Sequence, residues 1–181
     1  VLAGNVAASL SGEVFSLRGD EAANQVRITQ DSQGSILIEG LTGTRINGAP
    51  SVTFDGSGLE ATDLRLFGGN DYLEINRLRA AVDHNFELGL GNDNLVLRDV
   101  VAGVNLTAKL DDGADRLTAT GVRTGGDFNV EGGQGSNNLA ISSSTVTGVL
   151  NVLSLDSADT VNVSAVSVGK DLRINTGKGN D

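Results

Sequence analysis

The chain of 181 residues is long enough for one domain, and its 39% hydrophobic residues and 25 glycines fall within the range of globular proteins. It contains no Cys, one His and 3% aromatic residues, which excludes disulfide frameworks, thiolate metal sites and cysteine nucleophiles. The 23 acidic and 13 basic residues give a net charge of −10, which argues against nucleic-acid binding, and no apolar run approaches the ~20 residues of a transmembrane helix.

The first part of the chain, residues 1–60, contains short alternating runs separated by Gly, Asn and Asp turns. Residues 31–34 lie between two such runs, which predicts a β-hairpin. Residues 24–28 already resemble the unit that repeats further along. We therefore expect a β-rich N-terminal cap leading into irregular first coils. Solenoids need such a cap, because a bare first coil exposes apolar faces and unpaired strand edges.

Residues 61–181 repeat with a fixed period of 22 residues. A turn made of a small residue, any residue, and then Asp or Asn recurs six times without an insertion. Fixed self-similarity of this length is typical of a solenoid, in which each unit buries its apolar face against its neighbours. The repeated acidic or amide positions are Asp71, Asp93, Asp115, Asn137, Asp159 and Asp181.

Apolar residues within the repeat form three pairs of columns with a spacing of two in each pair. This spacing indicates three short strands per coil, each with one face inward. A helix over residues 73–88 is the rival interpretation, but the equivalent segments of later repeats are rich in Val, Ser, Thr and Gly, which favour strands. The prediction is an all-β fold: a right-handed parallel β-helix, a three-faced solenoid of 22 residues per coil. Its first buried column is expected to contain Leu73, Leu95, Leu117, Leu139 and Val161.

The acidic column raises an electrostatic problem, because stacked carboxylates about 4.8 Å apart repel one another. Backbone N–H donors, a shared Ca²⁺ or water would each relieve it. We expect each Asp or Asn to accept a hydrogen bond from N–H groups just ahead of it in an Asx-turn. Turn capping without a metal is favoured over calcium, because Ca²⁺ needs about six to eight oxygen ligands. If Ca²⁺ binds, the ligands are predicted where carboxylates are densest, at Asp93, Asp111, Asp112 and Asp115.

The glycine-rich turns carry a resemblance to a known family. Residues 132–139, GGQGSNNL, match the Gly-Gly-x-Gly-x-Asp-x-apolar repeat with Asn in place of Asp, and residues 89–95 and 176–181 match it in part. This resembles RTX-type and related parallel β-helix repeat regions of large secreted bacterial surface proteins. The resemblance implies an extracellular, bacterial cell-surface location. RTX repeats carry the turn roughly every nine residues, whereas this chain carries it once in 22.

The single histidine, His84, lies in a column of Leu and Phe and one repeat after Thr62. A hydrogen-bonded core histidine is therefore expected rather than a catalytic base. The sequence indicates no catalytic residue and no cofactor other than the conditional Ca²⁺. The protein is therefore not expected to be an enzyme.

Three functions are compared. The first is an extracellular structural protein, a solenoid subunit of a surface fibre or matrix that assembles head to tail. The alternative is a calcium-binding adhesive module of a larger bacterial surface protein, with extracellular polysaccharide or the cell surface as its partner. The third is a polysaccharide-degrading β-helix enzyme, which is disfavoured because lysines and sugar-stacking aromatic residues are scarce.

The structural interpretation depends on the last coil, which the sequence leaves within another turn motif and without a cap. We expect the N-terminal strands of a second copy, within residues 14–29 and 36–38, to cover this coil and to build an open filament. The residues predicted to form the assembly surface are Val163, Val166, Val168, Leu172 and Ile174.

Overall fold

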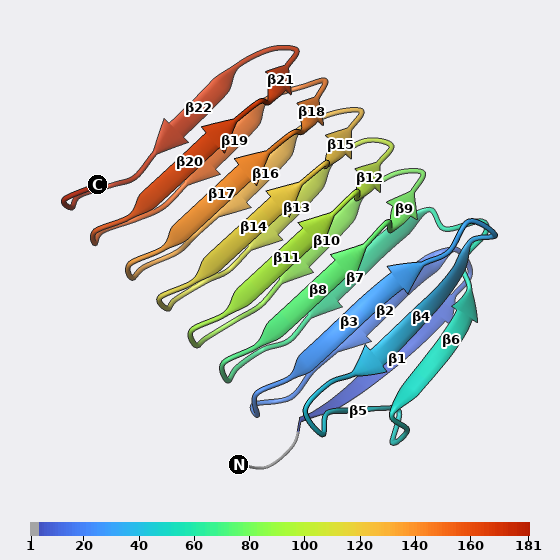
Figure 1. The fold of residues 1–181 in the computed structure, drawn as a ribbon. Coiled ribbons are helices and arrows are strands. Elements are labelled where there is room, and N and C mark those ends of the chain that lie inside the picture. The colour runs from blue at the N-terminus through green and yellow to red at the C-terminus, as the bar shows by residue number, and fades with distance from the viewer. Residues whose placement is uncertain (1–3) are drawn as a thin grey trace.

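The computed structural model describes residues 4–181 and has the predicted all-β fold, a stack of parallel coils (Figure 1). The described residues form three sheets and contain no helix, so none of them lies in a helix long and apolar enough to cross a membrane. The rival helix over residues 73–88 is absent, and the predicted strands are confirmed: the segment forms three of them, one for each face of the coil. These strands are β8 (Tyr72–Asn76), β9 (Arg79–Ala80) and β10 (His84–Glu87).

Each regular coil contributes one strand to each of the three sheets. The nine-stranded sheet contains β10 and β1 (Asn5–Ser11), β2 (Val14–Arg18), β5 (Arg45–Ile46), β7 (Ala61–Arg65), β13 (Leu106–Lys109), β16 (Phe128–Glu131), β19 (Leu150–Leu153) and β22 (Leu172–Asn175). The eight-stranded sheet contains β8 and β3 (Gln25–Gln30), β4 (Ser35–Gly40), β6 (Ser51–Asp55), β11 (Asn94–Arg98), β14 (Arg116–Thr120), β17 (Asn138–Ser142) and β20 (Thr160–Ser164). The five-stranded sheet contains β9, β12 (Val101–Ala102), β15 (Arg123–Thr124), β18 (Thr145–Val146) and β21 (Ser167–Val168).

The pairing register reproduces the 22-residue period. Leu95 pairs with Leu73 on one side and with Leu117 on the other, and the pairs between regular coils in the other two sheets keep the same offset. Because side chains alternate along a strand, this register places every second residue of each strand in the interior. The core is therefore a set of columns that run along the axis of the stack.

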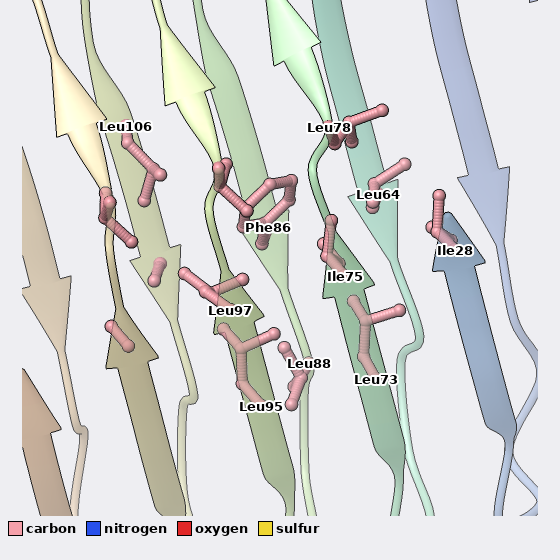
Figure 2. Packing of buried hydrophobic residues seen from close by; sticks show 14 of the residues in the cluster. Ile28, Leu64, Leu73, Ile75, Leu78, Phe86, Leu88, Leu95, Leu97 and Leu106 are labelled. Carbon is pink, nitrogen blue, oxygen red and sulfur yellow. The ribbon is translucent and has the colours of Figure 1, made fainter. Parts of the chain in front are cut away.

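Figure 2 shows these columns from close by, with Leu73, Ile75, Leu95 and Leu97 projecting into the interior between the sheets. All four are fully buried, as are Leu117 and Leu139 further along. Val161, the last member of the predicted column, is only half-buried, because the described chain supplies no coil beyond it. The predicted buried column is thus confirmed for its four leucines. For Val161 the prediction of burial is wrong, because this side chain is only half-buried.

The N-terminal strands join the stack before the regular period begins. Strand β2 pairs in parallel with β7, and β3 pairs in parallel with β8. Paired residues are here 47 positions apart in sequence instead of 22, because β4, β5 and β6 lie between β3 and β7 in the chain. Strand β1 pairs antiparallel with β2, and β4 pairs antiparallel with both β3 and β6. The predicted hairpin at residues 31–34 is the β3–β4 connection.

Candidate functional site

The acidic column forms a continuous ladder of hydrogen bonds between coils. The backbone N–H of each member donates to Oδ1 of the Asp or Asn in the next coil, as from Asp71 to Asp93 and from Asp93 to Asp115, each at 2.7 Å. The ladder starts at Asn24, whose N–H donates to Asp71 at 2.7 Å, and it continues through Asn137 and Asp159 to Asp181. The expected Asx-turn is wrong in direction, because Oδ1 accepts from the preceding coil rather than from residues just ahead.

Stacking of this kind requires the turns to approach closely. Gly91, two residues before Asp93, has a φ of 141° and lies against Gly69 of the preceding coil. A Cβ at Gly91 would collide with the carbonyl oxygen of Gly69. Glycine at this position therefore allows both the turn conformation and the contact between coils.

The ladder carboxyls are buried and only half satisfied. Asp71, Asp93 and Asp115 are each 2% exposed, and in each of them Oδ2 has no hydrogen-bond partner among residues 4–181; the same holds for Oδ2 of Asp159. Burial raises the pKa of Asp71 and Asp115 to about 7 and that of Asp93 to about 6. Neighbouring acidic groups act in the same direction.

The four predicted calcium ligands lie in two different surroundings. Asp93 and Asp115 are buried in the ladder, whereas Asp111 and Asp112 line a surface pocket of about 350 Å³ together with Glu87. Asp112 is exposed, and its Oδ1 accepts from the N–H of the next coil at 3.4 Å. Within residues 4–181, no three acidic or histidine side chains are grouped so that they could hold a metal ion. The predicted calcium cluster is thus not assembled, because the ladder turns two of its members toward the backbone.

The histidine occupies the predicted place in the core. His84 is 1% exposed, its Nδ1 accepts from the Thr62 hydroxyl at 2.8 Å, and its Nε2 donates to the Val101 carbonyl at 3.0 Å. Burial lowers the pKa of His84 to about 4, so the ring is neutral at pH 7. Both ring nitrogens are occupied by structural hydrogen bonds.

A second inter-coil ladder was not recognised in the sequence. Oδ1 of Asp83 accepts from the N–H of Asn105 at 2.8 Å, Oδ1 of Asn105 from Asp127 at 2.9 Å, and Oδ1 of Asp127 from Val149 at 2.8 Å. These three side chains are half-buried rather than buried. The signal that could have revealed them is the recurrence of Asp or Asn at the 22-residue spacing.

The last described coil presents open strand edges. Strands β20, β21 and β22 each pair on one side only, and they form the end of the stack marked C in Figure 1. Of the predicted assembly residues, Val163, Val166 and Val168 are half-buried, and Leu172 and Ile174 are 50% and 46% exposed.

The opposite end also has free edges, but they are not the predicted ones. Strands β2, β3 and β4 are paired on both sides, so residues 14–29 and 36–38 have no edge to offer to a second copy. The terminal strands of the three sheets at this end are β5, β6 and β9. The structure therefore corrects the strands that we expected to act as the N-terminal partner.

Comparisons with protein-family models, curated proteins and solved structures find no match to this chain.

Proposed function

We propose that this protein is an extracellular structural solenoid that assembles head to tail, with β20 of one copy continued by β6 of the next. The observation that carries the proposal is the correspondence between these two free edges of the eight-stranded sheet. The acidic composition and the RTX-like turns support a place outside the cell, at a bacterial surface. A contact between unlike ends does not close on itself, so it generates a linear assembly.

The direction of the two strands is compatible. Strand β6 is antiparallel to β4, and β4 is antiparallel to β3, so β6 runs in the same direction as β3 and the parallel strands that follow. Placing a second copy on the last coil by translation along the axis therefore sets β6 parallel to β20. Every pair of regular coils in this sheet is joined in the same way.

Strands β6 and β20 also agree in length and in which of their side chains face inward. Both strands have five residues, and in both the second and fourth residues are the half-buried, inward-facing ones. In β20 these are Val161 and Val163, and in β6 they are Val52 and Phe54. Parallel pairing would thus align apolar residues over the open columns, where they would remove exposed apolar surface from water.

The hydrogen-bonding groups of the two edges are complementary. The N–H of Thr160 points back to Asn137 of the preceding coil, so the N–H and C=O groups of Val161 and Val163 face outward. Gly40 donates to Pro50 and Gly56 donates to Gly34, so the alternate residues Ser51, Thr53 and Asp55 face away from β4. A parallel ladder needs this combination, in which each outward residue bonds to the two residues that flank its partner.

The test is the mass of the protein in solution, measured by light scattering over a range of concentrations. Wild type is expected to form species that lengthen with concentration, visible as thin filaments by electron microscopy. Thr53→Pro removes one outward N–H of β6 that β4 does not use, and it is expected to prevent assembly while the monomer stays folded. Thr53→Ala keeps this N–H and is the matched control. A monodisperse monomer at every concentration, or equal assembly of Thr53→Pro and wild type, contradicts the proposal.

A further inference from the structure

The principal ladder contains two kinds of side chain in one geometry. Asn137 accepts the inter-coil hydrogen bond through Oδ1, and its Nδ2 donates to the carbonyl oxygen of Gly135, two residues earlier, at 2.9 Å. Asn24, at the start of the ladder, likewise donates from Nδ2 to the carbonyl oxygen two residues earlier, that of Ala22, at 2.7 Å. At both positions, the second branch of the side chain is a hydrogen-bond donor to the turn.

The aspartates place an oxygen atom where the asparagines place this donor. Asp71, Asp93 and Asp115 accept the same inter-coil bond through Oδ1, so Oδ2 takes the branch that Nδ2 takes in Asn137. These Oδ2 atoms are buried, and no hydrogen-bond partner for them lies in the described part of the chain. A carboxylate oxygen and a carbonyl oxygen are both acceptors, so the arrangement is unfavourable unless Oδ2 carries a proton.

The charges around the ladder disfavour the carboxylate form as well. Asp71 faces Asp93 and Asp20, and Asp115 faces Asp93, Asp111 and Asp112. Asp93 faces Asp111 in addition to its ladder neighbours. These facing groups are all acidic, so they oppose ionisation of the buried carboxyls.

We propose that Asp71, Asp93 and Asp115 are carboxylic acids in the folded protein, each donating its Oδ2 proton to the carbonyl oxygen two residues earlier, and that the solenoid is consequently more stable in mildly acidic than in alkaline solution. The protonated ladder acts as an uninterrupted row of asparagine-like side chains. Above neutral pH, each carboxyl must either ionise in a buried position or expose itself, and the contact between coils weakens.

The direction of the pH dependence follows from linkage. The folded pKa values, about 7 for Asp71 and Asp115 and about 6 for Asp93, lie above the ordinary value of 3.8. Stability from these groups is therefore fully present below about pH 4 and is lost as the pH rises through 6 to 7. His84 acts in the opposite direction, because burial lowers its pKa to about 4. Its contribution cancels when a variant that retains His84 is compared with wild type at each pH.

The experiment compares the melting temperatures of wild type and the triple variant Asp71→Asn/Asp93→Asn/Asp115→Asn from pH 5 to pH 8.5. The two proteins are expected to melt within a few degrees of each other at pH 5. At pH 8.5 the triple variant is expected to melt higher than wild type by on the order of 5 °C or more. The matched control is Asp83→Asn/Asp127→Asn in the second ladder, which makes the same inter-coil bonds from half-buried positions and is expected to leave the pH profile unchanged.

An unchanged pH profile in the triple variant would overturn the proposal, as would a wild-type protein that is equally stable at pH 5 and pH 8.5 after the His84 contribution is subtracted. Calcium chloride added at pH 8.5 tests whether Oδ2 binds a metal ion instead of a proton. If it raises the melting temperature of wild type but not that of the triple variant, Oδ2 is a metal ligand and the proposal is overturned. Infrared spectroscopy of wild type provides a measurement that does not depend on folding of the variant. A protonated carboxyl band at pH 6 supports the proposal, and its absence contradicts it.

Discussion

At the residue scale, His84 shows how a polar side chain is accommodated in an apolar column. Nδ1 of the ring accepts a hydrogen bond from the Thr62 hydroxyl, and Nε2 donates one to the Val101 carbonyl. The ring also stacks on Phe86, with 5.4 Å between the ring centroids. Protonation would remove the acceptor that the Thr62 hydroxyl uses and would place a charge in the core, so the folded protein favours the neutral ring.

We predict that His84 makes the fold less stable as the pH falls from about 6.5 to 4.5. The unfolded chain takes up a proton near pH 6.5, whereas the folded protein resists until about pH 4. The expected loss approaches about 1.4 kcal/mol for each pH unit in the lower part of this range. The double variant Thr62→Val/His84→Leu removes the titrating group and its hydroxyl partner together. Urea unfolding at several pH values should show a flatter profile for this variant, and a profile as steep as that of wild type would refute the assignment.

The sequence predicted which residues share a column but not what the side chains do within it. The contact of His84 with Thr62 follows from the 22-residue spacing alone. The direction in which the ladder carboxyls reach was not predictable, because it depends on side-chain rotamers and on the closeness of stacked turns. The same holds for the unpartnered Oδ2 atoms, since burial of one oxygen but not the other is a property of the packed coil.

At the element scale, ion pairs join strands of neighbouring coils on the outer faces of the sheets. Glu74 on β8 accepts from Arg27 Nε on β3 at 3.0 Å and from the Tyr72 hydroxyl at 3.1 Å, and it also pairs with Arg98 on β11. Burial acts to raise the pKa of Glu74, but the hydrogen bonds from Arg27 and Tyr72 outweigh it and hold the pKa below its ordinary value. This carboxylate connects the first N-terminal coil to the regular coils.

We predict that Glu74→Gln destabilises the protein more than Glu131→Gln does. The Glu74 side chain is 12% exposed and has several partners, whereas Glu131 is 41% exposed and, among residues 4–181, forms an ion pair only with Lys109, at 3.0 Å. Loss of the Glu74 charge should cost about 1.5 kcal/mol, and loss of the Glu131 charge should cost less than about 1 kcal/mol. Denaturant unfolding of both variants in the same buffer measures the difference. Equal losses would mean that the Glu74 network adds nothing beyond an exposed pair.

The regular strands were predictable because their pattern occurs in every repeat, and the N-terminal strands were less so. Strands β2 and β3 follow the alternation, but β4, β5 and β6 have no counterpart elsewhere in the sequence. Strand β5 has two residues, too few for an alternating pattern to be recognised. Their pairing is decided by which edges of the first coil need covering, which is a tertiary property.

At the scale of the whole molecule, each regular coil among the described residues pairs its strands with those of the coil before it and the coil after it. The strand order of all three sheets is a linear series along the axis. Stability in such an array is approximately a sum of coil terms and nearest-neighbour terms. Position along the axis therefore matters as much as residue type, because a central coil has two neighbours and the last described coil has one.

The final prediction compares the same column at two positions. Leu117 is fully buried between β11 and β17, whereas Val161 is half-buried on β20 and has a neighbour on one side only. Leu117→Ala should cost about 2–5 kcal/mol, because it leaves a cavity between two complete coils. Val161→Ala should cost less, because it removes fewer atoms from a site that is partly exposed. Leu139→Ala is the control for residue size: it removes the same atoms as Leu117→Ala but lies one coil nearer the C-terminal end of the stack, so a difference between these two variants reports position alone. The measurement is the free energy of unfolding in urea under conditions where the protein is monomeric. Under these monomeric conditions, a loss for Val161→Ala as large as that for Leu117→Ala would contradict nearest-neighbour stability.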